Sequence, residues 1–293
     1  MRLGVVGLGV VGSATAELLK AIGHEVVSYD LNGSGTCPSA EELAGTVAAA
    51  FVCVPTPSGL MGRLDYSNVR HACLQLRGVP LTVVRSTVPV GTCRKLHGNV
   101  VYWPEFGNAR SMYDDMVVDP NVFLGGPGEL TTKVHNFLTS DTPVGDLWRT
   151  IYHRPWEDVE LLKLATNAAM ATKIAFANEA AYLAAKLGAD WGKVAEMLAL
   201  DPRLGSVGWL VPGPDGKCGF GGACLPKDLA GYCAQGADAL VKTTLADAAL
   251  AVNRRVRDPK PSKPRPPSCN CGAASDPAAC GHHPDCPMKS IEG

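Results

Sequence analysis

The feature that most restricts the fold of this chain is a glycine-rich turn between two predicted elements. The run Gly7-Leu8-Gly9-Val10-Val11-Gly12 follows a β-rich stretch at residues 2–6 and precedes an amphipathic helical pattern at residues 14–22. A second β-rich stretch, residues 25–29, ends at Asp30. This order of strand, glycines, helix, strand and acid predicts a dinucleotide-binding unit, and a glycine-rich turn in another kind of α/β protein is the alternative.

Each position of this turn has a physical reason. Gly7 permits the tight turn, Gly9 lets a pyrophosphate approach the backbone, and Gly12 lets the helix pack closely on the strand. The N–H groups at the helix N-terminus then face the phosphates. Asp30 is placed to bind the ribose diol of the adenosine, which favours NAD over NADP.

Composition narrows the class of protein further. The chain has 293 residues, of which 46% are hydrophobic, and its net charge of −1 argues against a nucleic-acid partner. The apolar run at residues 47–54 is too short to span a bilayer, so we expect no membrane partner. The apolar start imitates a short signal peptide, but glycines interrupt it. Eleven cysteines without a disulfide-like spacing favour a reducing cytoplasm.

We therefore predict an α/β chain with two domains and a tail. Residues 1–150 are expected to form a Rossmann-type, doubly wound parallel sheet, with further strands at 49–54, 81–84 and 99–102. Each of these apolar runs ends in Pro, Gly or hydroxyl residues, and such carboxyl ends line the ligand crevice of an open α/β sheet. Residues 151–258 are expected to form an all-helical second domain.

The second domain begins with a long helical pattern at residues 156–187, closed by Gly188. Lys163 and Asn167 lie four residues apart and share one helical face. An exposed polar pair is the common interpretation, but the apolar neighbours leave little room for a wide polar face. We favour a buried functional pair, and we expect Lys173 and Glu179 to be structural or exposed.

A second glycine-rich loop, Gly219-Phe220-Gly221-Gly222-Ala223, presents Cys224 on a turn. Lys227 nearby favours a thiolate, so Cys224 is a candidate nucleophile, and Asp228 is placed to orient a proton or a water. The alternative is an inert buried thiol. We assign that inert role to the other cysteines of the body: Cys37, Cys53, Cys73, Cys93, Cys218 and Cys233.

Together these segments resemble the UDP-glucose/GDP-mannose 6-dehydrogenase family. The matching motifs run in family order across residues 1–257, and the last of them is highly specific. They are G-L-G-V-V-G at Gly7, V-P-T-P at Val54, S-T-V-P-V-G at Ser86, P-E-F at Pro104, E-L-L-K-L-A-T-N at Glu160, D-P-R-L-G at Asp201 and G-F-G-G-A-C-L-P-K-D at Gly219.

The resemblance implies that the C6 alcohol of a nucleotide sugar is oxidised to a carboxylate with two NAD⁺. Cys224 would attack an intermediate aldehyde to give a thiohemiacetal, and a second hydride loss would leave a thioester that water cleaves. Lys163 and Asn167 would stabilise the oxyanions. Asp228 and Thr87 would hold the water, and Glu105 would act as the general base.

The resemblance also implies binding roles. The NAD site would comprise Gly7, Gly9, Val10, Val11, Gly12, Asp30, Val54, Thr56, Ser86, Thr87 and Lys227. The sugar would contact Glu105, Lys163, Asn167, Arg203, Phe220 and Gly221. Because the helix at residues 156–187 is similar to the family's dimer core, the resemblance implies that residues 151–258 are a dimerisation and substrate domain. A homodimer is thus implied, with Arg203 reaching the substrate from the second subunit.

The chain departs from the family at three places. The segment at residues 30–51 is shorter than in the family, so a helix or strand that is usual there is expected to be missing. The family commonly carries a second glutamate four residues after Glu105, where this chain has Ala109. A third domain, which covers the nucleotide half of the substrate, has no counterpart, so the sugar nucleotide is left open.

Residues 259–293 are expected to form a Pro- and Cys-rich tail that begins with an extended linker. It carries candidate zinc ligands: Cys269, Cys271, Cys280, His282, His283 and Cys286. A disordered, thiol-rich tail is the alternative, because C-x-C is not the usual C-x2-C pair of zinc sites.

The motifs leave three functions open. These are a two-step nucleotide-sugar dehydrogenase, a one-step NAD-dependent hydroxyacid dehydrogenase, and a trimmed NAD-binding paralogue without turnover. Cys224 favours the first, because the oxidation of an alcohol in one step needs no cysteine.

Overall fold

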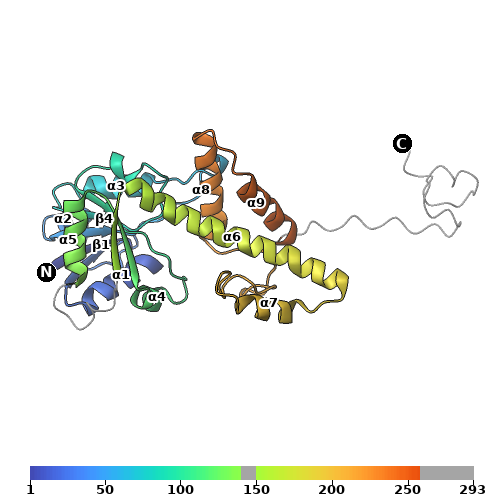
Figure 1. Cartoon of the computed structure of the whole chain (residues 1–293). Helices are drawn as coiled ribbons and strands as arrows, with labels where there is room; N and C mark the ends of the chain where they lie inside the picture. Colours follow the sequence, from blue (N-terminus) through green and yellow to red (C-terminus); the bar gives the residue numbers. More distant parts are fainter. Residues whose placement is uncertain (140–149, 258–293) are drawn as a thin grey trace, which may run out of the picture.

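A seven-stranded sheet organises the first half of the chain. The computed structural model describes residues 1–139 and 150–257 (Figure 1). The strand order is β2-β1-β3-β4-β5-β6-β7, and all neighbours are parallel except β5 and β6. The strands are β1 (Arg2–Val6), β2 (Glu25–Tyr29), β3 (Ala49–Val52), β4 (Thr82–Val84), β5 (Val100–Tyr102), β6 (Asn121–Gly125) and β7 (Thr150–Arg154).

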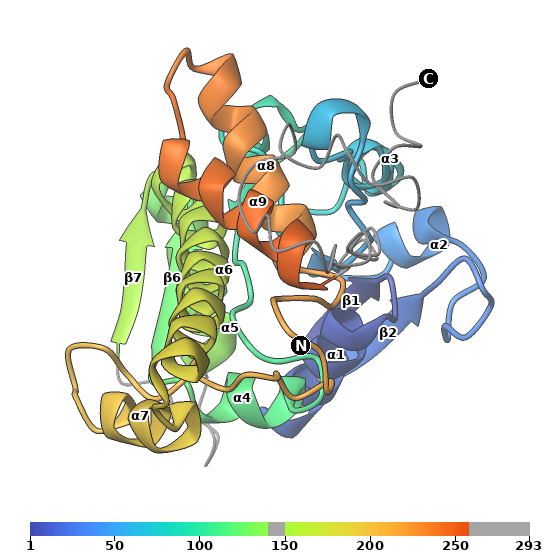
Figure 2. The ribbon, with the colours of Figure 1, turned by 90° about the vertical axis from the view of Figure 1, so that its right-hand side faces the viewer.

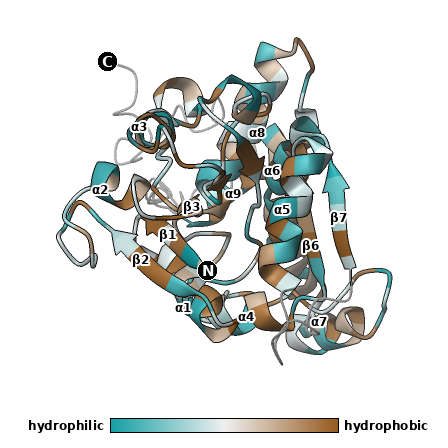
Figure 3. Cartoon of the chain, turned by 90° about the vertical axis from the view of Figure 1, so that its left-hand side faces the viewer, coloured by the Kyte–Doolittle hydropathy of each residue, from teal (hydrophilic) through white to brown (hydrophobic). Residues whose placement is uncertain are grey.

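Helices cover both faces of this sheet. The helices α1 (Val10–Ala21), α4 (Met112–Val118) and α5 (Gly128–Thr139) share one hydrophobic core with it. On the other face lie α2 (Ala40–Ala44), α3 (Ser67–Gln75) and the first turn of α6 (Trp156–Leu187). The buried parts of the strands are apolar apart from Ser28 in β2 and Thr82 in β4, as expected of parallel strands buried on both faces, and Figure 3 colours much of β1 and β6 as hydrophobic.

A single long helix connects the sheet to the helical half. From its start on the sheet, α6 runs outward, with α8 (Leu225–Asp238) and α9 (Thr244–Arg257) on one side and α7 (Trp191–Ala199) on the other (Figures 1 and 2). Buried alanines of α6 pack against Phe220, Leu229 and the inner face of α9. A smaller cluster joins Ala177 to Ala195 and Trp209.

The predicted doubly wound sheet and the helical region are confirmed. The strands β1 and β2 and the helix α6 have the predicted bounds, and Gly188 ends α6 with a φ of 75°. The sequence reading missed β6 and β7, and the domain boundary expected after residue 150 falls inside β7. Residues 30–51 still contain a helix, α2, although it has only five residues.

No helix in residues 1–139 or 150–257 is both long and apolar enough to cross a membrane.

Candidate active site

The glycine turn after β1 has the geometry that a dinucleotide requires. Gly7 has a φ of +89°, in the left-handed region that glycine tolerates. A Cβ on Gly12 would collide with the carbonyl oxygen of Gly7, so α1 packs onto the turn only because this residue is glycine. A Cβ on Gly9 would meet nothing within 4 Å, and no side chain caps α1. The turn therefore offers an open backbone surface and a helix N-terminus to an anionic group.

Asp30 lies beside this turn, at the end of β2. Its Oδ1 accepts a hydrogen bond from the N–H of Asn32 at 3.0 Å, and its Oδ2 accepts one from the N–H of Leu8 at 2.5 Å. These two bonds, that of Asn32 first, lower the pKa of Asp30. A charged carboxylate is thus fixed where the ribose of a dinucleotide is expected.

The loops that follow β3 and β4 are tied to each other and to α6. Ser86 donates a hydrogen bond from Oγ to the carbonyl oxygen of Val54 at 2.6 Å. The carboxylate of Glu160, which is fully buried, accepts the N–H groups of Gly91 at 2.5 Å and Cys93 at 2.8 Å. Thr56 is buried and Thr87 is half-buried in the same loops. No role of Glu160 was predicted from the sequence, although its spacing from Lys163 places it on the same helical face.

Lys163 and Asn167 occupy that face one and two turns further along α6. Lys163 is buried and donates a hydrogen bond from Nζ to the carbonyl oxygen of Glu105. Asn167 is half-buried and donates from Nδ2 to Oδ2 of Asp228 at 2.6 Å. The predicted polar pair therefore faces inward, and Lys173 and Glu179 are structural: Lys173 binds the carbonyl oxygens of Leu204 and Gly205, and the exposed Glu179 pairs with Arg255.

Four ionisable groups act on the ammonium group of Lys163. Burial lowers its pKa, and the nearby carboxylates of Glu105 and Asp228 and the thiol of Cys224 act in the opposite direction. Lys227 adds a smaller lowering effect through like charge. The structure thus brings together five residues that the sequence analysis had selected from three separate motifs.

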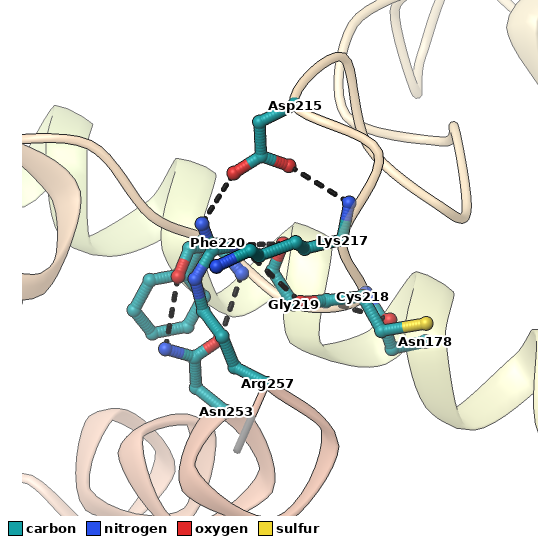
Figure 4. A network of polar contacts seen from close by, with 8 residues as sticks. All are labelled: Asn178, Asp215, Lys217, Cys218, Gly219, Phe220, Asn253 and Arg257. Atoms are coloured by element: carbon teal, nitrogen blue, oxygen red, sulfur yellow. Dashed lines mark hydrogen bonds and ion pairs between the residues drawn. The ribbon is translucent and has the colours of Figure 1, made fainter.

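Cys224 is exposed and is the N-cap residue of α8. Side chains from two other helices hold the backbone of the loop that leads to it (Figure 4). Asn178 of α6 accepts the N–H of Gly219 at 2.8 Å, and Asn253 of α9 pairs with both the N–H and the carbonyl oxygen of Phe220, at 2.7 and 3.0 Å. Arg257 donates to the carbonyl oxygens of Cys218 and Gly219 and pairs with Asp215.

Glu105 follows β5 and is 8% exposed. Its Oε2 accepts the N–H of Gly107 at 2.9 Å. Burial raises the pKa of Glu105, and this outweighs the lowering by Lys163, by the N–H of Gly107 and by the positive charge of Arg85. A carboxyl group with a raised pKa suits proton transfer near neutral pH.

One predicted assignment needs correction. Cys218 is exposed, so it is not an inert buried thiol. Phe220 is 2% exposed and both of its backbone groups are bonded to Asn253, so its side chain belongs to the core, and its contact with a sugar stays a prediction. Cys73 and Cys93 are buried, and burial raises the pKa of Cys73 to about 12.

Two predictions concern residues outside this cluster of contacts, namely Arg203 and the candidate zinc ligands. Arg203 is exposed and pairs with Asp201 of its own loop at 2.5 Å. The six candidate zinc ligands lie outside the described residues. Among the residues that the structure does describe, no cluster of three or more His, Cys, Asp or Glu side chains is arranged to hold a metal ion.

Comparison with known proteins supports the family resemblance that the motifs predict. Residues 157–255 match the model of the central domain of the UDP-glucose/GDP-mannose dehydrogenase family. A UDP-glucose 6-dehydrogenase from Rickettsia bellii is 32% identical over 64% of this chain and 45% of its own length. One from Rhizobium meliloti is 29% identical over 86% of this chain and 67% of its own length. The chain thus spans about half to two thirds of these relatives.

Solved structures show the same fold. A UDP-glucose dehydrogenase from Pyrobaculum islandicum superimposes with a TM-score of 0.78 and 28% identity, covering 86% of this chain and 68% of its own. A 3-hydroxyisobutyrate dehydrogenase from Mycobacterium tuberculosis, 18% identical, shares the fold with a TM-score of 0.67 over 87% of this chain and 92% of its own. Behind its Rossmann-type sheet, the chain carries a segment, residues 157–255, that matches the central domain of the UDP-glucose/GDP-mannose dehydrogenase family, and the resemblance predicted from its motifs is confirmed.

Proposed function

We propose that this protein is an NAD-dependent dehydrogenase that oxidises the C6 alcohol of a nucleotide sugar to a carboxylate through Cys224. The observation that carries this proposal is the inward-facing pair on α6: Lys163 is buried beside Glu105, and Asn167 is bonded to Asp228 in the first turn of α8. An alcohol oxidation in one step would not require the cysteine that stands at the start of that helix.

The residues present fit a dinucleotide. The open surface at Gly9 and the uncapped N-terminus of α1 suit a pyrophosphate, and the Asp30 carboxylate suits a ribose diol. NAD⁺, when bound, accepts the hydride. The loops carrying Val54, Thr56, Ser86 and Thr87 lie at the carboxyl ends of β3 and β4, where the rest of the cofactor is expected.

The balanced reaction consumes two NAD⁺ and one water. Loss of a hydride and a proton converts the alcohol to an aldehyde, and the sulfur of Cys224 adds to the carbonyl carbon to form a thiohemiacetal. Loss of a second hydride and proton gives a thioester. Water then adds to that carbonyl, the C–S bond breaks, and the acid and the free thiol are released. The products are the carboxylate, two NADH and the corresponding protons.

Each neighbouring side chain has a task in these steps. Cys224, the N-cap residue of α8, supplies the sulfur that adds to the carbonyl carbon. Lys163 and Asn167 are the donors for the oxyanions that form at the carbonyl. Asp228 and Thr87 hold the water, and Glu105 takes its proton.

Two NADH per sugar would be the direct sign of this chemistry. The full chain is supplied with NAD⁺ and, in turn, UDP-glucose, GDP-mannose and related sugars, and NADH is counted per sugar consumed. We expect a ratio of two and complete loss of the acid product in Cys224→Ala. Cys218→Ala, which removes an exposed thiol six residues earlier in the same loop, is the matched control and should keep its activity.

Other outcomes identify the alternatives. One NADH per substrate without dependence on Cys224 would indicate a one-step hydroxyacid dehydrogenase. Binding of NAD⁺ without turnover of any sugar would indicate a paralogue that only binds the cofactor.

We further propose that α6 is the core of a homodimer. Beyond its buried site face, the helix exposes Phe176, Tyr182, Leu183 and Leu187, and α7 exposes Met197. An exposed apolar surface of this kind is typical of a protein interface. Sedimentation velocity should show a dimer that Leu183→Glu converts to monomers, whereas Val118→Glu, at an exposed valine of α4, should leave it intact. A monomeric parent protein would refute the interface.

A further inference from the structure

A buried arginine lies on the sheet side of Glu105. Arg85 follows β4 and is 2% exposed. Its guanidinium carbon lies 3.7 Å from the ring centroid of Trp103, which is a cation–π contact, and its Nη2 lies 3.5 Å from the sulfur of Met116. Its Nε and Nη1 have no hydrogen-bond partner among the described residues. Because an uncompensated buried charge is costly, this side chain requires a functional or electrostatic reason.

A small cavity joins Arg85 to Glu105. Its volume is about 30 Å³, and both side chains line it together with Trp103, Asp115 and Asp119. That volume accepts a water molecule or two, and the polar lining suits them. It is far too small for a sugar or a nicotinamide ring, so Arg85 does not reach substrate from this position.

The charges around Glu105 come from three directions. Arg85 faces it from the end of β4 and Lys163 from α6, and both lower its pKa. Asp115 of α4 raises the pKa, as burial does, and Asp119 lines the same cavity. The groups around Arg85 itself are Glu105, Cys53 and Tyr102. Since Lys163 is bonded to the backbone oxygen of Glu105, Arg85 is the cation whose side chain shares the cavity with the carboxylate.

We propose that Arg85 is a positioning residue for Glu105: from the sheet side, across the small cavity that both residues line, its buried guanidinium supplies a counter-charge to the carboxylate in addition to that of Lys163. This inference deepens the proposed function, because it rests on the role of Glu105 as the base of thioester hydrolysis. An arginine suits this place better than a lysine, because its planar group stacks on Trp103 and retains its charge when buried.

The titration of Glu105 tests this directly. The protein is labelled with ¹³C at the glutamate side-chain carboxyl carbon, and Glu105→Gln identifies the resonance. In Arg85→Met, the midpoint of the Glu105 titration should rise, because a nearby opposite charge has been removed. Arg94→Met is the matched control: Arg94 also lies over a tryptophan, at 5.5 Å from the ring centroid of Trp156, but it is exposed and pairs with Glu157.

An unchanged midpoint in Arg85→Met, or an equal rise in Arg94→Met, would overturn the proposal. If Arg85→Met does not fold, the parent protein provides the test. The Nε–H resonance of Arg85, assigned with Arg85→Lys, should then titrate with the same midpoint as the Glu105 carboxyl carbon, and a resonance that does not move overturns the proposal. These measurements need no substrate. A failure of the NADH count therefore leaves them interpretable, and a failure of the titration leaves the NADH count unaffected.

Discussion

Asn167 and Asp228 join the two helices of the site through a bond of 2.6 Å from the amide Nδ2 to the carboxylate Oδ2. The second oxygen of Asp228 accepts the ammonium group of Lys227 at 2.5 Å, and the side chain is 1% exposed. Both oxygens of a buried carboxylate are therefore satisfied, one from α6 and one from α8 itself. This bond holds the start of α8, which carries Cys224, next to the proposed hydrogen-bond donors of α6.

Replacing Asn167 by alanine should lower both activity and stability. The change leaves one oxygen of a buried carboxylate without its partner, which costs about 1–3 kcal/mol of unfolding free energy. It also removes a proposed oxyanion donor, so kcat should fall about 100- to 1000-fold. The control is Thr166→Ala, because Thr166 is exposed and bonds only within its helix, to the carbonyl oxygen of Leu162. Equal kinetics in the two variants would exclude a role for Asn167.

Alanine at Gly9 and alanine at Gly12 should have different effects. At Gly9 the new methyl group meets no protein atom within 4 Å, so the melting temperature should not change. The affinity for NAD⁺ should fall about tenfold or more, because the phosphates can no longer approach the backbone closely. At Gly12 it would collide with the Gly7 carbonyl, so both quantities should fall. Thermal unfolding and calorimetric NAD⁺ binding measure the two effects. If Gly9→Ala binds NAD⁺ as tightly as the parent protein, the phosphates do not bind at Gly9.

Glu105→Gln should make stability less dependent on pH. The pKa of Glu105 is raised in the folded protein above its ordinary value of 4.5, so between these two values the folded chain binds a proton that the unfolded chain has released. The unfolding free energy of the parent protein therefore falls as pH rises through that window, by about 1.4 kcal/mol for each unit of pKa difference. Glutamine carries no such proton, so the fall should be smaller in the variant.

Urea denaturation at a series of pH values above 4.5 measures this difference. Glu160, whose pKa burial also raises, contributes equally to both proteins. Glu129→Gln, at an exposed position of α5, should reproduce the parent curve. Parallel curves for the parent protein and Glu105→Gln would contradict the raised pKa.

Asn253→Ala should loosen the loop that presents Cys224. The change removes both hydrogen bonds to the backbone of Phe220 and leaves two buried groups unpaired, at a cost of about 2–3 kcal/mol of unfolding free energy. Arg255→Ala, two residues along α9, breaks only an exposed ion pair with Glu179 and should cost less than about 1 kcal/mol. A variant at Asn253 that keeps full turnover would show that loop rigidity is not needed for the cysteine chemistry.

The sequence predicted those parts of the fold that local patterns determine. The bounds of α6 followed from a continuous Ala- and Leu-rich pattern and a terminal glycine, and the burial of Lys163 followed from its apolar neighbours. The strand β7 was missed because its side chains are only partly buried, and its pairing with β6 depends on contacts 29 residues apart in the chain, as between Asn121 and Thr150.

Arg85 shows why the rest of the site could not be predicted. In the sequence it is a charged residue next to Ser86, and nothing local indicates burial. Its environment is made by Trp103 after β5 and Met116 of α4, which reach it only when the sheet and its covering helix assemble. Phe220 is a second example. Its motif indicates a ligand contact, but only the packing of α6, α8 and α9 around it places its side chain in a core.

The side chains of Glu160, Lys163 and Asn167 bind three different parts of the molecule from one face of α6: the loop after β4, the loop after β5 and the start of α8. Because each residue of an α-helix adds about 100° of rotation, this face exists only at the present spacing. One residue inserted after Glu160 would turn both later side chains away from their partners while leaving Glu160 in place. The number of residues between these positions is therefore as restricted as their identity, whereas Thr166, on the outward side of the same turns, is exposed.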